Sequence, residues 1–166
     1  MNEPESRRCG ACTACCHVLE IDDAQLVKPA GVLCGHCTNG CTIYDRRPKV
    51  CRDWLCMWRE FPGLLDDSWR PDRCGVLMRM TEVDASGNEV PYFEVLDAGK
   101  VNWTGLAAAI APYLRAGDNV HFGVAAKDDK PGRGLPLRRG LSPDADLPAI
   151  KAGLLAALDA LDTRSG

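Results

Sequence analysis

The sequence predicts an α+β protein in which an irregular, cysteine-rich N-terminal module packs on a small antiparallel sheet with helices. Nine of the ten cysteines lie before residue 60. The same segment has no sustained helical or strand period, whereas the rest of the chain alternates strand-like and helix-like patterns. We therefore divide the chain into a cysteine-rich module at residues 1–62 and a small α+β region at residues 63–166, packed together as one compact unit.

The module contains one candidate helix. Leu19, Leu26 and Val27 are apolar, and Asp22 and Asp23 suit a helix start, so we expect a helix at residues 18–27. A segment this poor in periodic apolar residues cannot bury enough surface to fold by itself. Bonds to metal would have to replace the missing core.

A hairpin opens the second region. Residues 74–83 are rich in Val, Leu and Met, residues 84–88 have turn chemistry, and residues 91–96 predict the returning strand. A third strand is expected at residues 120–125. Residues 127–140 are rich in Gly, Pro and basic side chains, which predicts a mobile loop or linker.

Two helices complete this region. Leu106, Ile110 and Leu114 recur every four residues, which predicts a helix at residues 103–116. Gly117 would end this helix, and Pro112 would kink or shorten it. A last helix is expected after residue 146, with one apolar face formed by Leu147, Ile150, Leu154, Leu158 and Leu161.

Composition and charge exclude some classes of function. The 166 residues are 46% apolar and 26% charged, and no run approaches the roughly 20 apolar residues of a membrane span. The net charge of −3 gives no bulk attraction to anionic lipid and disfavours nucleic acid as a partner. Residues 1–8 lack the apolar core of a secretory signal, which predicts a cytoplasmic protein.

The cysteines form a CxxCxxCC run, a second CxxC pair and three further cysteines. In a reducing compartment, clustered thiols bind metal or do redox chemistry more often than they form disulfides. A spacing of two residues lets a tight turn direct both sulfurs at one ion. The pattern therefore predicts metal ligands at Cys9, Cys12, Cys15, Cys16, Cys34, Cys37, Cys41, Cys51 and Cys56.

The spacing leaves the metal open. The run is not a ferredoxin motif, because its fourth cysteine follows at once and no proline comes after it. Adjacent residues project in different directions, so Cys15 and Cys16 are not expected to serve one tetrahedral ion. The thiols suit two four-cysteine zinc sites, one iron–sulfur cluster with extra ligands, or a polynuclear arrangement.

Other polar residues near the cysteines receive simpler interpretations. The cysteines suffice for four-coordination, so we place His36 beside the ligands and His17 in solvent or beside them, although either imidazole could replace a thiolate. Cys74 is expected to be a buried free thiol. Arg47 and Arg52 belong to a basic stretch that would offset the charge of several thiolates, with a solvated basic face as the alternative.

These motifs together resemble the zinc- or iron-chelating cysteine-cluster family of bacterial proteins, often called the CxxCxxCC domain. The resemblance covers the CxxCxxCC run, the downstream cysteine pair and C-x-I-Y-D-x-R-P-x-x-C-R-x-x-x-x-C, here Cys41 to Cys56. It implies that Cys37 is an additional ligand candidate and that the family's ligand positions are Cys9, Cys12, Cys15, Cys16, Cys34, Cys41, Cys51 and Cys56. Arg47, Pro48 and Arg52 match its RPxxCR element.

Three functional hypotheses follow. The leading one is a protein that binds zinc or iron, with an iron–sulfur cluster among the options, in an accessory, sensing or electron-transfer role. The sequence contains no GxSxG, P-loop, HExxH or Rossmann motif, which argues against an enzyme. The second hypothesis is nevertheless an iron–sulfur-dependent modifying enzyme, since flagellin lysine N-methylases have a related motif, or a thiol redox catalyst. The third is a zinc-ribbon-like nucleic-acid binder. No particular protein partner is indicated.

Overall fold

The computed structural model describes residues 7–81, 87–128 and 131–163. Short 3-10 turns lie at Tyr44–Arg46, Asp67–Trp69, Ala98–Lys100 and Leu137–Arg139. The helices and strands are α1 (Ala14–Val18), β1 (Ile21–Asp23), β2 (Leu26–Lys28), α2 (Lys49–Asp53), α3 (Met57–Glu60), α4 (Pro71–Cys74), β3 (Val76–Thr81), β4 (Val90–Val95), α5 (Trp103–Ala116), β5 (His121–Val124), β6 (Arg133–Pro136) and α6 (Leu147–Thr163).

The helix predicted at residues 18–27 is wrong. The chain leaves α1 at Leu19 in an extended conformation and forms the antiparallel β1–β2 pair, with Ile21 opposite Lys28. The Asp23 carboxylate accepts a hydrogen bond from the Gln25 backbone N–H at 2.9 Å, which stabilises a tight turn. Aspartate side chains that bond to the backbone two residues on favour turns over helix interiors.

A four-stranded sheet forms the second region, in the order β3-β4-β5-β6. The predicted hairpin is confirmed as the antiparallel β3–β4 pair, while its turn at residues 84–88 lies mainly outside the described residues. β4 and β5 are parallel because α5 carries the chain back across the sheet, and β5–β6 is antiparallel. The α+β class is confirmed.

The expected loop at residues 127–140 contains β6, so that prediction is wrong in part. Gly134 lies opposite Gly123 in the β5–β6 register. A Cβ atom at either glycine would lie within 2.6 Å of the Tyr92 hydroxyl. Gly134, one of the glycines that indicated a loop, therefore makes room together with Gly123 for the Tyr92 ring.

Both predicted helices of the second region are confirmed. α5 begins after Asn102, whose side chain accepts a hydrogen bond from Gly105 N, and ends at Gly117 with φ of 79°. The helix continues past Pro112, which is exposed, so water can reach the carbonyl that loses its partner. In α6, Ile150, Leu154 and Leu161 are buried as expected, and Leu158 packs partly buried against the same core.

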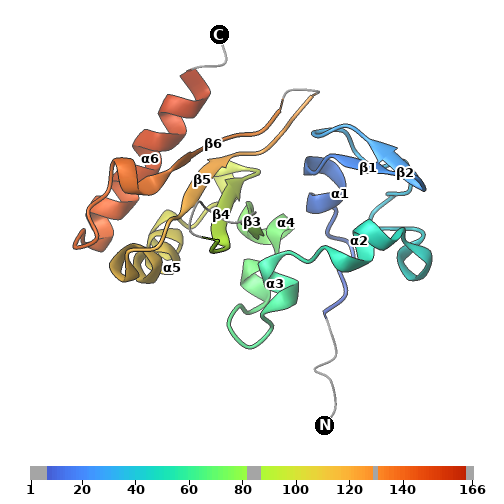
Figure 1. Ribbon diagram of the computed structural model, residues 1–166, viewed down its shortest axis with the longest axis horizontal. Coiled ribbons are helices and arrows are strands. Elements are labelled where there is room, and N and C mark those ends of the chain that lie inside the picture. The colour runs from blue at the N-terminus through green and yellow to red at the C-terminus, as the bar shows by residue number, and fades with distance from the viewer. Residues whose placement is uncertain (1–6, 82–86, 129–130, 164–166) are drawn as a thin grey trace.

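Helices α5 and α6 lie on one side of the sheet, and the cysteine-rich module lies beyond its other side (Figure 1). Fully buried side chains such as Phe93, Phe122 and Ile110 form the core between sheet and helices. Val18 and Trp58 of the module belong to the same hydrophobic cluster. Among the described residues, no helix is long and apolar enough to cross a membrane.

Candidate metal centre

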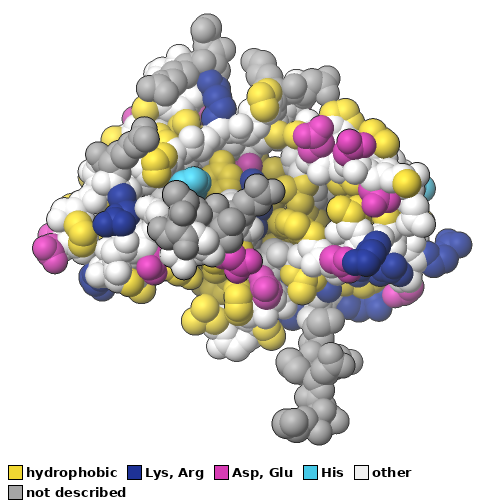
Figure 2. Space-filling view, viewed as in Figure 1, with side chains coloured by type: hydrophobic (Ala, Val, Ile, Leu, Met, Phe, Trp, Pro, Cys, Tyr) yellow, Lys and Arg dark blue, Asp and Glu magenta, His cyan; other side chains and the backbone are white. Residues whose placement is uncertain are grey.

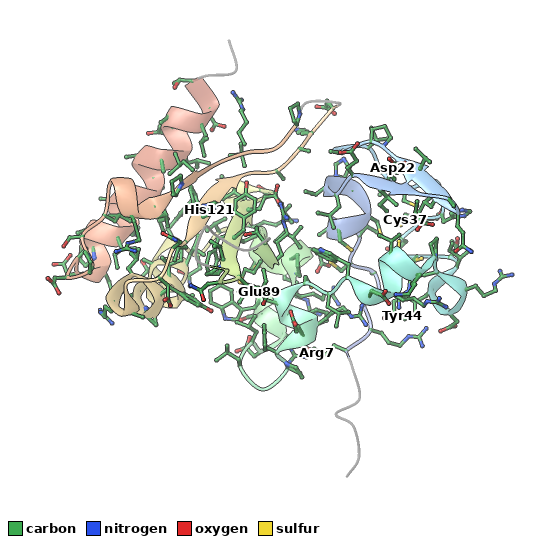
Figure 3. All side chains as sticks on the ribbon, in the orientation of Figure 1. Arg7, Asp22, Cys37, Tyr44, Glu89 and His121 are labelled. Atoms are coloured by element: carbon green, nitrogen blue, oxygen red, sulfur yellow. The ribbon has the colours of Figure 1, made fainter. Side chains whose placement is uncertain are left out.

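The cysteines of the module converge on one cavity of about 190 Å³. Cys37 adjoins the cavity through a hydrogen bond with Cys16. In Figure 3, sulfur atoms gather near Cys37, between α1, the β1–β2 hairpin and α2. All nine predicted ligands are thus brought together, eight of them in the cavity wall itself: Cys9, Cys12, Cys15, Cys16, Cys34, Cys41, Cys51 and Cys56.

Tight turns place the cysteines. The N–H of Cys12 donates to the carbonyl of Cys9 at 3.1 Å, and the N–H of Cys37 donates to the carbonyl of Cys34 at 2.9 Å, so each CxxC forms a turn. Gly40 makes the next loop feasible. Its φ is 118°, and a Cβ there would lie 2.6 Å from the carbonyl oxygen of Gly10.

Four of the thiols form a hydrogen-bonded chain. The Cys15 thiol bonds to both Cys9 and Cys16, and Cys16 also bonds to Cys37. Hydrogen bonding from Cys15 lowers the pKa of Cys9 to about 6, helped by the charges of Arg59 and Arg47. The same donor lowers the pKa of Cys16 to about 6, whereas the pKa of Cys15 is raised.

Burial acts in the opposite direction on the other thiols. It raises the pKa of Cys12 to about 11 and also raises the pKa values of Cys37, Cys41 and Cys51, because a thiolate loses its hydration there. Burial likewise raises the pKa of Cys56. Deprotonating this group of thiols therefore requires positive charge to enter the cavity.

Two buried cations lie beside the thiols. Lys28 is 4% exposed, and its ammonium donates to the carbonyls of His17, Pro29 and Val32 at 3.0, 2.8 and 2.7 Å. Arg59 is 8% exposed, and its Nε donates to the carbonyl of Arg7 at 2.5 Å. Neither has a carboxylate within salt-bridge distance among the described residues.

Tyr44 connects the predicted basic stretch to the thiols. Its side chain hydrogen-bonds to Cys9, and the guanidinium of Arg47 stacks 3.7 Å from its ring centroid. Arg47 also lines the cavity. His36 lines the cavity while remaining exposed, whereas Arg52 is exposed on α2.

Trp58 contributes an unpaired donor. The residue lines the cavity and is 4% exposed, and its Nε1 is the one buried side-chain nitrogen or oxygen without a hydrogen-bond partner in the described part of the chain. An unpaired buried N–H costs about 1–3 kcal/mol. A hydrogen-bond acceptor placed in the cavity could relieve that cost.

Apart from Glu20, the rest of the cavity wall is apolar, formed by side chains such as Leu19, Ile21 and Leu77. Figure 2 shows hydrophobic side chains in the hollow between the module and the helix-covered half. Such a wall limits access of water to the thiols.

Cys74 lies outside this cavity. Its half-buried thiol donates to the carbonyls of Trp69 at 3.5 Å and Val76 at 3.3 Å, at the end of α4 rather than in the predicted strand. It is a free thiol. His17 lines a separate cavity of about 380 Å³ together with Lys127 and Arg133.

Sequence reasoning missed Lys28, Arg59, Tyr44 and Trp58. Lys28 comes directly after the segment that the pattern assigned to a helix, residues 18–27, so its position beside the thiols had no sequence signal. Trp58 and Arg59 stand two and three residues after Cys56, and that proximity was the only available hint.

As the side chains stand, no three His, Cys, Asp or Glu residues in the described ranges are arranged to hold one metal ion. Thiol side chains would have to change rotamer to converge on one. No family model matches the chain, and no curated protein or solved structure matches it significantly.

Proposed function

We propose that this protein binds zinc or iron through thiolates of its cysteine-rich module and acts in an accessory, sensing or electron-transfer role. The observation that supports this proposal most strongly is that nine cysteines meet at one place beside two buried cations. The cysteine spacing alone suggested metal ligands. The buried cations beside the cysteines add a reason for negative charge to reside on the sulfurs.

Burial of a charged side chain costs free energy. A buried cation without a partner is expensive, because it loses its hydration. Lys28, Arg59 and Glu94 are the buried charged residues among those described. Glu94 pairs with Arg79 at 3.3 Å, whereas Lys28 and Arg59 have thiols as their nearby ionisable partners. A metal bound by thiolates would supply the missing negative charge.

The cysteines around the cavity have the ligand chemistry that bound zinc or iron requires. Thiolates are the preferred ligands of structural zinc and of iron–sulfur clusters. Trp58 offers an N–H to an acceptor in the cavity, and hydrogen bonds to ligand sulfur are common around such centres. Bound zinc would cross-link the module, and bound iron would supply a redox couple.

The direct test is metal analysis of protein purified anaerobically, together with its absorption spectrum. We expect stoichiometric metal, with visible sulfur-to-iron bands if it is iron and none if it is zinc. Cys16→Ser should lower the metal content, because Cys16 hydrogen-bonds to two other thiols.

Cys74→Ser is the matched control, because Cys74 is outside the cavity, and its metal content should equal that of the wild type. Wild-type protein with no tightly bound metal and ten freely titratable thiols would refute the proposal.

A thiol redox function is the second candidate, favoured by the lowered pKa values of Cys9 and Cys16, both due first to hydrogen bonding from Cys15. A thiolate is the nucleophile in disulfide exchange. This function predicts reversible disulfide formation involving Cys15 or its neighbours when metal-free protein meets a disulfide substrate. Disulfide mapping by mass spectrometry would distinguish it, since tightly bound metal would block the exchange.

A further inference from the structure

The adjacent cysteines of α1 reach different thiols. The thiols of Cys15 and Cys16 bond to each other, and beyond that pair Cys15 hydrogen-bonds to Cys9 and Cys16 to Cys37. Cys9 precedes α1, whereas Cys37 belongs to the loop after β2. The two neighbouring side chains thus connect thiols from two separate segments of the module.

Backbone hydrogen bonds and electrostatic interactions divide the remaining cysteines into the same two groups. On one side, the Cys12 N–H donates to the Cys9 carbonyl at 3.1 Å, and Cys56 interacts electrostatically with both Cys12 and Cys9. We name these residues the Arg59 set: Cys9, Cys12, Cys15 and Cys56.

On the other side, the Cys34 N–H donates to the Cys16 carbonyl at 2.9 Å, and Cys37 pairs with Cys41 in an isolated antiparallel bridge. Cys51 is electrostatically coupled to Cys16, Cys34 and Cys41. We name these residues the Lys28 set: Cys16, Cys34, Cys37, Cys41 and Cys51.

Each set has its own buried cation. The charge of Arg59 acts on Cys9 and Cys56. Lys28 interacts most strongly with Cys34 and Cys16, and also with Cys15 and Cys37, so three of its four thiols belong to the Lys28 set. Three backbone carbonyls hold the Lys28 ammonium in place. The two buried cations therefore lie at different places among the thiols.

We propose that the cavity holds two metal centres, one in each set, and that Arg59 and Lys28 each offset the negative charge of their own centre. This inference rests on the metal-binding function proposed above. Four thiolates with one divalent ion have a net negative charge, whereas four protonated thiols are neutral. A fixed cation beside the sulfurs therefore favours the loaded centre.

The test uses the full chain reconstituted with cadmium(II) under anaerobic, reducing conditions, observed by cadmium NMR and by chelator competition. The wild type should show two thiolate-bound resonances and two separable affinities. Lys28→Met should weaken one centre about tenfold and Arg59→Met the other, because each removes a single nearby charge. The control Arg115→Met removes an exposed cation of α5 and should weaken neither.

Lys28→Met loses three hydrogen bonds and could fail to fold. A second pair of variants tests the two centres without changing Lys28. Cys12→Ser should abolish only the cadmium resonance that Arg59→Met affects. Cys37→Ser should abolish only the resonance that Lys28→Met affects. One resonance, or equal loss of both in every variant, would overturn the division into two centres and leave metal binding intact. Absence of bound cadmium in the wild type would overturn the proposed function as well.

Discussion

Burial separates the charged side chains of this protein into two kinds. Some ion pairs are exposed at both ends, such as Arg8 with Asp45, and such pairs contribute about 0–1 kcal/mol. Glu94 is different, because it is 3% exposed on β4 and contacts the partly exposed Arg79. Burial raises the pKa of Glu94, and the Arg79 charge opposes that rise only in part.

The raised pKa of Glu94 predicts a pH-dependent stability. The native state binds this proton more tightly than the unfolded state, so the contribution is fully present below the unfolded pKa and is lost as pH rises through the folded pKa. Glu94→Gln should therefore gain stability relative to the wild type as pH rises from about 4 to about 7.

Denaturant unfolding of both proteins across that range measures this difference. A difference that stays constant with pH, or that falls as pH rises, would contradict the prediction. Asp45→Asn is a suitable control, because Asp45 is an exposed carboxylate in an exposed pair.

At the scale of elements, α5 combines a strong apolar face with an unfavourable residue. Leu106, Ile110 and Leu114 are each at most 1% exposed and pack in the core. Pro112 lies on the solvent side of the same helix and leaves one carbonyl without its helical partner. The apolar face therefore outweighs the local preference against helix.

Pro112→Ala should stabilise the protein, by up to about 3 kcal/mol, because alanine restores the helical N–H. The gain is reduced because proline also restricts the unfolded chain. Thermal unfolding should show a higher Tm. The matched control is Pro148→Ala, because Pro148 is exposed in the first turn of α6, where the N–H has no helical partner. A Tm gain of equal size in the control would contradict this explanation.

At the scale of the whole molecule, the two parts of the chain are stabilised in different ways. The sheet with α5 and α6 has a large apolar core, whereas the module has short elements around a cavity of thiols. Trp58 and Val18 connect the two parts through the shared cluster. Local stability should therefore differ along the chain, since regions with few buried apolar contacts open more easily.

Removal of the proposed metal should loosen the module more than the sheet. After treatment with a strong chelator, backbone amides of α1, β1 and β2 should exchange with solvent faster, whereas those of β4, β5 and α5 should keep their protection. Hydrogen exchange with mass spectrometry measures both sets in one experiment. Equal loss of protection everywhere would show that the chain unfolds as one unit, and no loss anywhere would show that metal does not support the module.

The sequence by itself determined the elements whose signal is local and repeated. The period of Leu106, Ile110 and Leu114 together with Gly117 was enough for α5, and the run of apolar residues was enough for β3 and β4. The cysteine spacing likewise identified the residues that meet in the module. These signals depend on neighbours within a few positions, so no knowledge of the fold is needed.

Only the tertiary structure decided the remaining features, because they depend on residues far apart in the chain. Residues 18–27 form a hairpin rather than a helix, which places Lys28 against the thiols. Gly134 belongs to a strand because Tyr92 of β4 covers it. The burial of Arg59 and Trp58 follows from packing of α3 on the sheet. Burial and charge compensation are properties of the assembled fold, and local spacing does not encode them.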